Sequence, residues 1–302
     1  NGACDGTLDD PGVVVACGAV MPVFLRTTGT MRGRSFFLKR RGGTVGTLRI
    51  PVTVAVIERP EGLLLIDTGW SRRACAFPDD EPGTAARLAL GLDVKPEDNL
   101  SSQLLSLGLN PGDVRDVVAT HLHTDHISGA LDFPGADLHV SETEWSALDA
   151  GRLRGYDPAL RTHPRVRQHA LDGPAILGFY ASRDLFGDGT VFLLDAQGHT
   201  RGSVAVAVQL DKGWLVHAGD AAMFAEDFRL SDDVPPSPYM RLVAWDQRHQ
   251  RATWHHLREA EDHHGARVVV SHDPDQLAAL PQTRDAGWKT VWDARRAKPR
   301  PE

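Results

Sequence analysis

Three histidines and one aspartate stand within six consecutive residues, and no other feature constrains this chain so strongly. The run is His121-Leu122-His123-Thr124-Asp125-His126. Imidazole and carboxylate groups are ligands of zinc and related ions. In a hydrophobic core, each of these groups would need its own polar partner. The run therefore predicts a metal site, in preference to the alternative of a polar surface turn.

The residues before the run predict that it lies at the end of a strand. Val117-Val118-Ala119 is apolar and rich in β-branched side chains, as expected of a short buried strand. The histidines would then lie where the chain leaves a sheet. Binding and catalytic residues commonly lie on loops held by a rigid scaffold.

Composition narrows the class of protein. The chain has 302 residues, of which 41% are hydrophobic and 24% charged, as in a soluble globular protein. No apolar run approaches the ~20 residues of a membrane helix. The net charge of −7 gives no reason to expect nucleic-acid binding. The basic stretch 32–41 is interpreted as a solvated hairpin, with an anion-steering rim as the alternative.

Neither the cysteines nor the first residue fixes the compartment. Cys4, Cys17 and Cys75 are too few for a disulfide framework, although one Cys4–Cys17 bridge remains open. The chain begins with Asn1, which fits either a removed leader or a trimmed start. A cytoplasmic and an exported protein therefore both remain open, as does a homodimer.

The pattern along the chain predicts a flexible tail at 1–12 and one domain at 13–302. Strands are expected at 13–23, 52–57, 63–66, 137–140, 191–194, 203–210, 214–217 and 267–270. Helices are expected at 99–109, capped by Ser101 or Ser102, at 142–150, capped by Ser141, and at 245–264. The segment 151–182, rich in Arg, Pro and Gly, is expected to cross the surface, as a possible lid over the site.

Further ligands should return from distant strands, because six adjacent residues cannot all face one ion. His199, Asp220 and His272 each follow directly after a predicted strand. Gly198 and Gly219 precede two of them, which fits tight turns that bring backbone close to the site.

Together these motifs resemble those of the metallo-β-lactamase superfamily. They are H-x-H-x-D-H at 121–126, Gly-His-Thr at 198–200, Gly-Asp at 219–220, Ser-His-Asp at 271–273 and Leu-Ile-Asp-Thr-Gly at 65–69. The resemblance covers about residues 50–275. It implies an αβ/βα four-layer sandwich, in which two mixed β-sheets are flanked by helices and a dinuclear metal site lies at one edge.

The resemblance also implies how the ligands are divided. His121, His123 and His199 would hold one ion, and Asp125, His126 and His272 the other. Asp220 would bridge the two ions, and Asp67 would support the ligands without binding an ion itself. Two Zn²⁺ are the default cofactors, with manganese, iron or cobalt as alternatives. A hydroxide between the ions would be the nucleophile, and Asp125 would orient it and carry a proton.

Within the superfamily, residues 133–145 and 271–274 resemble the N-acyl homoserine lactonase branch. True β-lactamases typically lack an equivalent of Asp220. We therefore expect a small-molecule ester or lactone substrate and opening of a lactone ring, with quorum quenching as its role. The alternatives are an organophosphate, aryl ester or phosphodiester hydrolase. Iron oxidoreductases and non-catalytic members of this fold are disfavoured, because they usually keep fewer ligands.

One departure concerns the substrate pocket. Several lactonases of this branch carry a tyrosine three residues after the bridging aspartate, where this chain has Met223. Help for the substrate oxygen must then come from the metals or from elsewhere. Trp70, Met223 and Phe224 are predicted to line the pocket, and Phe36, Phe37, Phe179 and Tyr180 are further candidates. The histidines outside the motifs are interpreted as surface or hydrogen-bonded structural residues.

Overall fold

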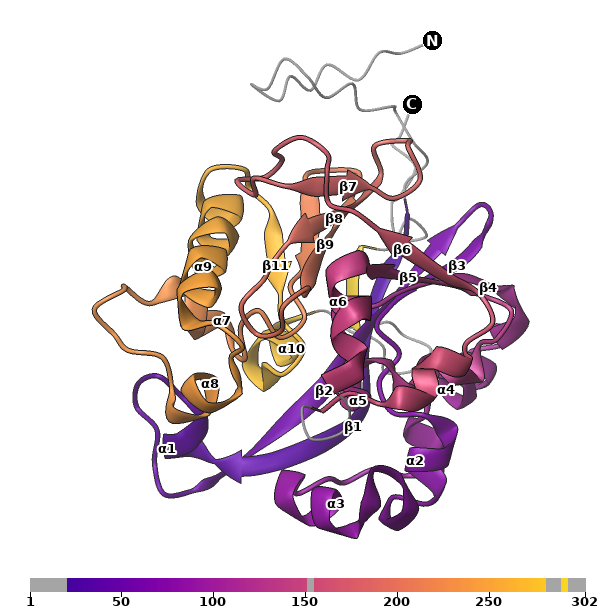
Figure 1. Ribbon diagram of the computed structural model, residues 1–302, viewed down its shortest axis with the longest axis horizontal. Helices are drawn as coiled ribbons and strands as arrows, with labels where there is room; N and C mark the ends of the chain where they lie inside the picture. Colours follow the sequence, from indigo (N-terminus) through magenta and orange to yellow (C-terminus); the bar gives the residue numbers. More distant parts are fainter. Residues whose placement is uncertain (1–20, 151–154, 281–288, 293–302) are drawn as a thin grey trace, which may run out of the picture.

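Two β-sheets form the centre of the computed structural model, which describes residues 21–150, 155–280 and 289–292 (Figure 1). In the seven-stranded sheet the strand order is β12-β1-β2-β3-β4-β5-β6, and in the five-stranded sheet it is β11-β10-β9-β8-β7. The predicted tail, the Cys4–Cys17 bridge and most of the strand expected at 13–23 lie outside the described residues.

Each sheet is mixed and draws its strands from different parts of the chain. The first contains β1 (Val23–Arg34), β2 (Thr47–Arg59), β3 (Gly62–Ile66), β4 (Val114–Val118), β5 (Asp137–Ser141), β6 (Val166–His169) and β12 (Lys289–Trp292). The second contains β7 (Ser182–Asp184), β8 (Val191–Asp195), β9 (Val204–Gln209), β10 (Trp214–His217) and β11 (Arg267–Val269). In the first sheet β3, β4, β5 and β6 run parallel, whereas β1, β2 and β3 are antiparallel.

The helices lie outside the two sheets. They are α1 (Ser35–Leu38), α2 (Arg72–Ala76), α3 (Thr84–Leu90), α4 (Leu100–Ser106), α5 (Thr124–Ile127), α6 (Glu142–Ala147), α7 (Ala225–Arg229), α8 (Pro238–Val243), α9 (Gln247–Asp262) and α10 (Pro274–Ala279). The expected αβ/βα sandwich is confirmed.

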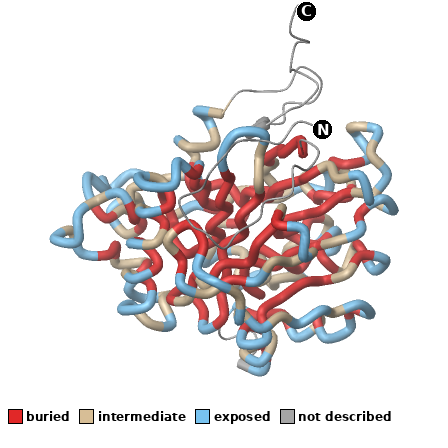
Figure 2. Tube along the Cα trace, turned by 90° about the horizontal axis from the view of Figure 1, so that it is seen from above, coloured by how far each residue is buried: buried red, intermediate tan, exposed pale blue. Residues whose placement is uncertain are grey.

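Side chains alternate between the two faces of each strand, and this explains why the first sheet has an apolar core on both sides. In β2, Ala55 and Ile57 point into an inner core shared with the second sheet, where they join Leu193 and Val206. Val54 and Val56 point the other way, into a core that also contains Leu100 and Leu104 of α4. Both faces of the sheet are therefore apolar, as expected where helices cover a sheet. Buried residues accordingly fill the middle of the molecule, and exposed ones form its rim (Figure 2).

Local signals in the sequence set several element ends. Arg59 pairs with Gly62, so a tight turn that includes Glu61 joins β2 and β3. The Ser141 hydroxyl accepts a hydrogen bond from the Glu144 N–H at 3.1 Å and caps α6, as predicted. The cap of α4 differs from the prediction. Asn99 is the cap, and its side-chain oxygen accepts from Ser101 N–H at 3.1 Å and Ser102 N–H at 3.4 Å.

The segment 155–182 is more than a surface excursion. It carries β6, which forms the edge of the first sheet beside β5. It also buries Tyr156, Leu160 and Phe179. Its first described residue, Gly155, accepts hydrogen bonds from Thr124 N–H and Oγ1, both at 2.9 Å, so the segment starts against the histidine run.

Among the basic residues of the stretch 32–41, Arg40 departs from the expected solvated hairpin. Arg40 is buried, and its guanidinium donates to the backbone carbonyls of Asp227, Ser231, Val234 and Pro235. The guanidinium also lies 4.7 Å from the centre of the Trp254 ring. Arg40 thus links the loop before α8 to α9.

Among the described helices, none is long and apolar enough to cross a membrane.

Candidate metal centre

The histidine run begins just beyond the end of β4 and continues into α5, at an edge where loops from both sheets meet. Three sets of side chains bring their potential ligand atoms within 4.8 Å of one another. The first set is His121, His123 and His199, and the second is Asp125, His126 and His272. The third, His121, His126 and Asp220, joins the first two. Each set could hold a metal ion.

Asp220 lies between the first two sets. Its Oδ1 is 3.2 Å from His126 Nε2 and 3.1 Å from His272 Nε2. Its Oδ2 is 3.5 Å from His199 Nε2. One carboxylate oxygen therefore faces each set, which is the geometry that a bridging ligand requires.

The side chains present fit a metal. His121 Nε2 is buried and has no hydrogen-bond partner among the described residues, and the same holds for Asp220 Oδ1. Buried polar atoms normally have partners, because an unpaired one costs a few kcal/mol. Here the two unpaired atoms lie within 4.8 Å of each other, beside further imidazole nitrogens and carboxylate oxygens. A cation placed there would satisfy them.

Neighbouring groups contact the Nδ1 atoms of three of these histidines and so fix the orientation of their rings. Asp67 Oδ2 is 2.9 Å from His126 Nδ1, and Asp67 Oδ1 accepts the Thr120 N–H at 2.8 Å. The Thr120 hydroxyl also lies 3.1 Å from His121 Nδ1. The Pro51 carbonyl is 2.7 Å from His272 Nδ1. Contacts of this kind orient metal-binding histidines and set which nitrogen points at the ion.

Burial and nearby charges shift the pKa values of the candidate ligands in different directions. Burial lowers the pKa of His121 well below its ordinary value and that of His199 to about 3, so both rings are neutral, as metal ligation requires. Burial also opposes protonation of His126, but Asp220 and Asp125 outweigh it and raise its pKa. For Asp220, burial is outweighed by His272 and His126, which hold its pKa well below the usual range.

Two glycines let the ligand loops approach the rest of the protein. Gly219 has φ of 53°, and a Cβ there would lie 2.6 Å from the Thr120 hydroxyl. Gly198 has φ of 138°, and a Cβ there would lie 2.3 Å from Gln250 Cα in α9. The tight turns predicted beside His199 and Asp220 are confirmed, and a side chain at either position would push a ligand loop outward.

A buried carboxylate joins the loops from the two sheets. Glu144 in α6 accepts hydrogen bonds from Leu122 N–H at 3.0 Å, Thr200 Oγ1 at 2.8 Å and Gly202 N–H at 3.0 Å. Leu122 belongs to the histidine run, and Thr200 follows His199. Glu144 thereby sets the spacing between two ligand loops. In the sequence, Glu144 is expected only as a residue of the helix at 142–150.

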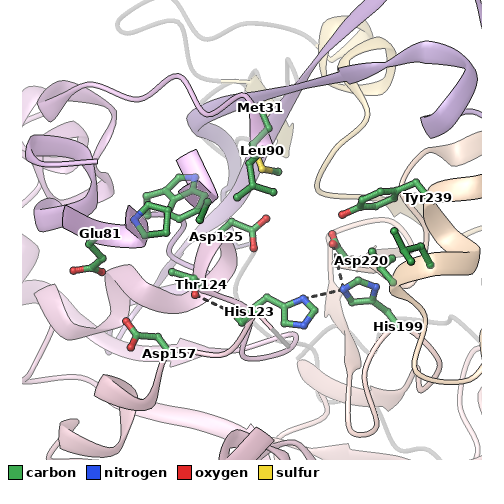
Figure 3. A pocket seen from close by; sticks show the side chains of 16 residues that line it. Met31, Glu81, Leu90, His123, Thr124, Asp125, Asp157, His199, Asp220 and Tyr239 are labelled. Atoms are coloured by element: carbon green, nitrogen blue, oxygen red, sulfur yellow. Dashed lines mark hydrogen bonds and ion pairs between the residues drawn. The ribbon is translucent and has the colours of Figure 1, made fainter. Parts of the chain in front are cut away.

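A cavity of about 420 Å³ opens over the cluster (Figure 3). His123, Asp125, His199 and Asp220 lie in its wall, as does the predicted residue Trp70. Gly155 and Asp157 belong to the segment 151–182 that was expected as a lid. The other lining residues were not predicted and come from β1, α3, α5, α8 and the segment between α2 and α3: Met31, Glu81, Pro82, Ala86, Leu90, Thr124, Tyr239, Leu242 and Val243. Much of the wall is therefore apolar, with the polar groups gathered near the metal ligands.

Tyr239 is the most informative residue that the sequence analysis missed. It lies in α8, and its hydroxyl points into the cavity toward Asp125 and Asp220 (Figure 3). Burial, followed by the charges of Asp220 and Asp125, raises the pKa of this phenol. The Tyr239 ring meets Phe37 edge-on, with 5.9 Å between ring centres. A hydroxyl is thus present opposite the ligands, although position 223 lacks one.

The other aromatic candidates lie elsewhere. Met223 and Phe224 are buried in the core around the second sheet and do not line this cavity. Their N–H groups donate hydrogen bonds to the Asp227 carboxylate at 3.0 Å and 2.9 Å. Phe179 is buried in the same core, whereas Tyr180 is 82% exposed. Phe36 and Phe37 line a neighbouring cavity. The pocket wall expected from Met223 and Phe224 is therefore supplied by other residues.

One remaining histidine differs from the expected surface or hydrogen-bonded state. His217, at the end of β10, is fully buried, and in the described part of the chain neither ring nitrogen has a hydrogen-bond partner. Burial lowers its pKa to about 4, so the ring is neutral. His139, by contrast, is hydrogen-bonded to His169 and to Asp116, both at 2.9 Å.

Comparison with known proteins agrees with this geometry. Residues 48–297 match the family model of the metallo-beta-lactamase superfamily. A probable metallo-hydrolase of Mycobacterium tuberculosis is 33% identical over 239 residues, covering 74% of this chain and 76% of the relative. The N-acyl homoserine lactonase AttM of Azorhizobium caulinodans is 26% identical over 257 residues, covering 84% and 93%.

Solved structures show the same fold. An N-acyl homoserine lactone hydrolase with N-hexanoyl-L-homoserine bound at its catalytic metal centre superposes with a TM-score of 0.68 at 20% identity, covering 87% of this chain and 98% of the other. The dizinc quorum-quenching lactonase AidC gives 0.59 at 16% identity, covering 91% and 95%. The chain therefore belongs to the metallo-β-lactamase superfamily and is a metal-dependent hydrolase that resembles its N-acyl homoserine lactonase branch.

Proposed function

We propose that this protein opens the ring of a lactone by hydrolysis, with N-acyl homoserine lactones as candidate substrates and quorum quenching as the role. The observation that carries the proposal is the placement of Asp220, with one oxygen toward each histidine set, beneath a largely apolar cavity. Relatives named N-acyl homoserine lactonases support the choice of ester.

In this proposal each of the two sets of ligands would hold one ion. His121, His123 and His199 would hold the first, Asp125, His126 and His272 would hold the second, and Asp220 would be shared by both. Two dications at a short distance repel each other, and a shared carboxylate offsets that repulsion. Zinc suits such nitrogen and oxygen ligands. When bound, the ions supply Lewis acidity and lower the pKa of water toward neutrality.

The chain's own side chains direct the chemistry. Asp125 lies in the cavity wall, where its carboxylate orients the attacking water and receives its proton. Attack forms a bond from the water oxygen to the carbonyl carbon, and the ring C–O bond then breaks. Asp125 returns the proton to the leaving alkoxide, so that one water is consumed and a hydroxy acid is formed.

Tyr239 provides a neutral hydrogen-bond donor in this reaction. Its hydroxyl points toward the same region as Asp125 and Asp220 (Figure 3), from an element unrelated to the metal motifs. A donor at this place stabilises negative charge as it develops on the substrate oxygen. Trp70 forms an apolar wall that holds the ring of the substrate.

A substrate panel with the metal-loaded protein tests the proposal. It contains acyl homoserine lactones of several chain lengths, simple γ- and δ-lactones, an aryl ester, an aryl phosphotriester, a β-lactam and S-lactoylglutathione. The free acid formed by ring opening releases a proton, so a pH indicator follows the lactones. We expect the lactones to give the highest kcat/KM. A loaded protein that turns over no lactone would contradict the proposal.

A further inference from the structure

Arg40 and Tyr239 are linked through one short element of the chain. Phe37 of α1 meets the Tyr239 ring edge-on, and Arg40 follows α1 after a single residue. The Lys39 N–H donates to the Ser35 carbonyl at 2.9 Å, which closes α1 directly before Arg40. Arg40 is therefore fixed to the element that the Tyr239 ring contacts.

The guanidinium of Arg40 also holds the segment that leads into α8, the helix that carries Tyr239. It donates to four backbone carbonyls: those of Asp227, Ser231, Val234 and Pro235. Pro235 stands two residues before Ser237, whose hydroxyl accepts the Met240 N–H at 3.1 Å and caps α8. The N–H groups of a guanidinium lie in one rigid plane, so they fix these carbonyls relative to one another. Arg40 thereby sets where α8 begins.

One face of the same guanidinium lies over Trp254 of α9, which is hydrogen-bonded to the loop of Asp220. The guanidinium carbon is 4.7 Å from the centre of the Trp254 ring. The Trp254 Nε1–H donates to the Ala221 carbonyl at 2.7 Å, and Gln250 Nε2 donates to the same carbonyl at 3.2 Å. Ala221 directly follows Asp220. Contacts therefore run from Asp220 through Trp254 and Arg40 to α8.

Burial of Arg40 shows what its contacts contribute. A buried guanidinium loses much of its hydration, and its hydrogen bonds have to offset that loss. An apolar side chain of similar length would fill the same space without losing hydration. What the guanidinium adds is the fixed direction of its N–H groups toward the carbonyls before α8.

We propose that Arg40 is a positioning residue for hydrolysis, which holds α8 so that the Tyr239 hydroxyl stays opposite Asp125 and Asp220 (Figure 3). The proposal rests on the proposed function, in which Tyr239 stabilises developing negative charge. Such a donor acts at one place, and a misplacement of about 1 Å can lower a rate about 100-fold. Because Arg40 acts through Tyr239, it should affect kcat and leave KM unchanged.

The variant Arg40→Lys tests this role. Lysine keeps the charge but lacks the planar fork that reaches several carbonyls at once. The zinc-loaded protein is assayed with N-hexanoyl-L-homoserine lactone and with p-nitrophenyl butyrate. We expect kcat to fall about tenfold, with KM and metal content within about twofold of the wild type. An unchanged kcat would overturn the proposal.

Arg251→Lys is the matched control. The Arg251 guanidinium donates to the Asp232 carbonyl at 3.2 Å, in the same segment but on its exposed side. We expect kcat to stay within about twofold of the wild type. A loss as large as that in Arg40→Lys would show that any change to this segment slows the reaction, and would refute a specific role of Arg40.

A double-mutant cycle with Tyr239→Phe shows whether Arg40 acts through the hydroxyl. In the Tyr239→Phe background, Arg40→Lys should change kcat by less than about twofold, because the group that it positions is already absent. Trp254→Phe keeps a ring beneath the guanidinium and removes the hydrogen bond to Ala221. It should show the same dependence on Tyr239, and it decides the question if Arg40→Lys does not fold. Equal loss in both backgrounds would contradict the proposal.

Hydrogen exchange in α8 gives a readout that needs no substrate. The Arg241 N–H donates to the Ser237 carbonyl at 3.0 Å, in the first turn of this helix. We expect this amide to exchange faster in Arg40→Lys and at the wild-type rate in Arg251→Lys. If its rate in Arg40→Lys equals that of the wild type, Arg40 does not hold α8 and the proposal fails.

These measurements separate the proposal from the function on which it rests. If the aryl ester shows the coupling to Tyr239 and the lactone is not turned over, the role of Arg40 stands and the lactonase proposal fails. If the lactone is turned over and Arg40→Lys retains the wild-type kcat, the lactonase proposal stands and the role of Arg40 fails.

Discussion

Asp220 presents its two oxygens to different sets of ligands, and this arrangement makes a specific prediction. Asp220→Asn replaces one charged oxygen by an amide, which cannot bind a second cation. We expect bound metal per protein, measured by elemental analysis, to fall together with the hydrolytic rate. Asp211→Asn, at an exposed position, serves as the control. A fully loaded and fully active Asp220→Asn protein would refute the bridging role.

Tyr239 is predicted to act on kcat. Tyr239→Phe keeps the ring against Phe37 and removes only the hydroxyl, so we expect kcat to fall about 10- to 100-fold. KM should change little, and metal content should not change. Tyr180→Phe, at a tyrosine that is 82% exposed, should leave both constants intact. If Tyr239→Phe raises KM alone, the hydroxyl binds substrate without stabilising the developing charge.

The contrast between ligands and pocket residues shows what the sequence could reveal. His199 and Asp220 stand beside glycines at the ends of apolar strands, so short patterns marked both them and their place in the fold. No local pattern separates Tyr239 from Tyr180. The surroundings of Tyr239 are set by how α8 packs beside α1, whereas Tyr180 lies against His256 of α9, and both depend on tertiary structure. The wall of the cavity was therefore only partly predictable, with Trp70 identified and Met223 and Phe224 misplaced.

At the scale of elements, α6 is predicted to set the spacing of the ligand loops through Glu144. In Glu144→Gln, an amide group replaces one acceptor oxygen and faces donors instead. We expect the free energy of unfolding, from urea titration, to fall by about 2 kcal/mol. Glu142→Gln, exposed on the same helix, is the matched control. Equal stability of the two variants would show that Glu144 does not hold the loops.

Element types were predicted where the apolar pattern was strong, and missed where it was weak. The strands at 63–66 and 214–217 are apolar runs, and both were found. β6 reads Val-Arg-Gln-His and buries little, because it pairs with β5 on one side only and lies at the sheet edge. Such a strand resembles a loop in sequence. The cap of α4 was misplaced because Asn99, Ser101 and Ser102 are all suitable caps.

For the whole molecule, Asp227 predicts how stability depends on pH. Burial raises the pKa of this carboxyl to about 7, although it accepts hydrogen bonds from Phe224 and Met223 and lies near Arg40. The folded state therefore holds a proton that the unfolded state releases near pH 4. This contribution is present at low pH and is lost as pH rises from about 4 to 7.

The variant Asp227→Asn tests this contribution. The fall in melting temperature between pH 5 and pH 8 should be smaller in Asp227→Asn than in the wild type. Melting curves at both pH values measure it, with Asp211→Asn as the control. An unchanged difference between the two pH values would show that Asp227 titrates normally in the folded protein.

Removal of metal should also destabilise the whole molecule. A ligand that binds only the folded state stabilises it, so a chelator is expected to lower the melting temperature of the loaded protein. Adding back Zn²⁺ should restore the original value. If the chelator removes the metal and the melting temperature does not change, metal binding where the loops of the two sheets meet would be contradicted.

The position of the ligands across both sheets has a consequence for synthesis of the chain. His121, His123, Asp125 and His126 follow β4, whereas His199 follows β8 and His272 follows β11. Neither ion can acquire its full set from the first half of the chain alone. The first set is complete only after His199 has left the ribosome, and the second only after His272. The first proposed metal site can therefore be completed before the second, which also requires β11 and the loop after it.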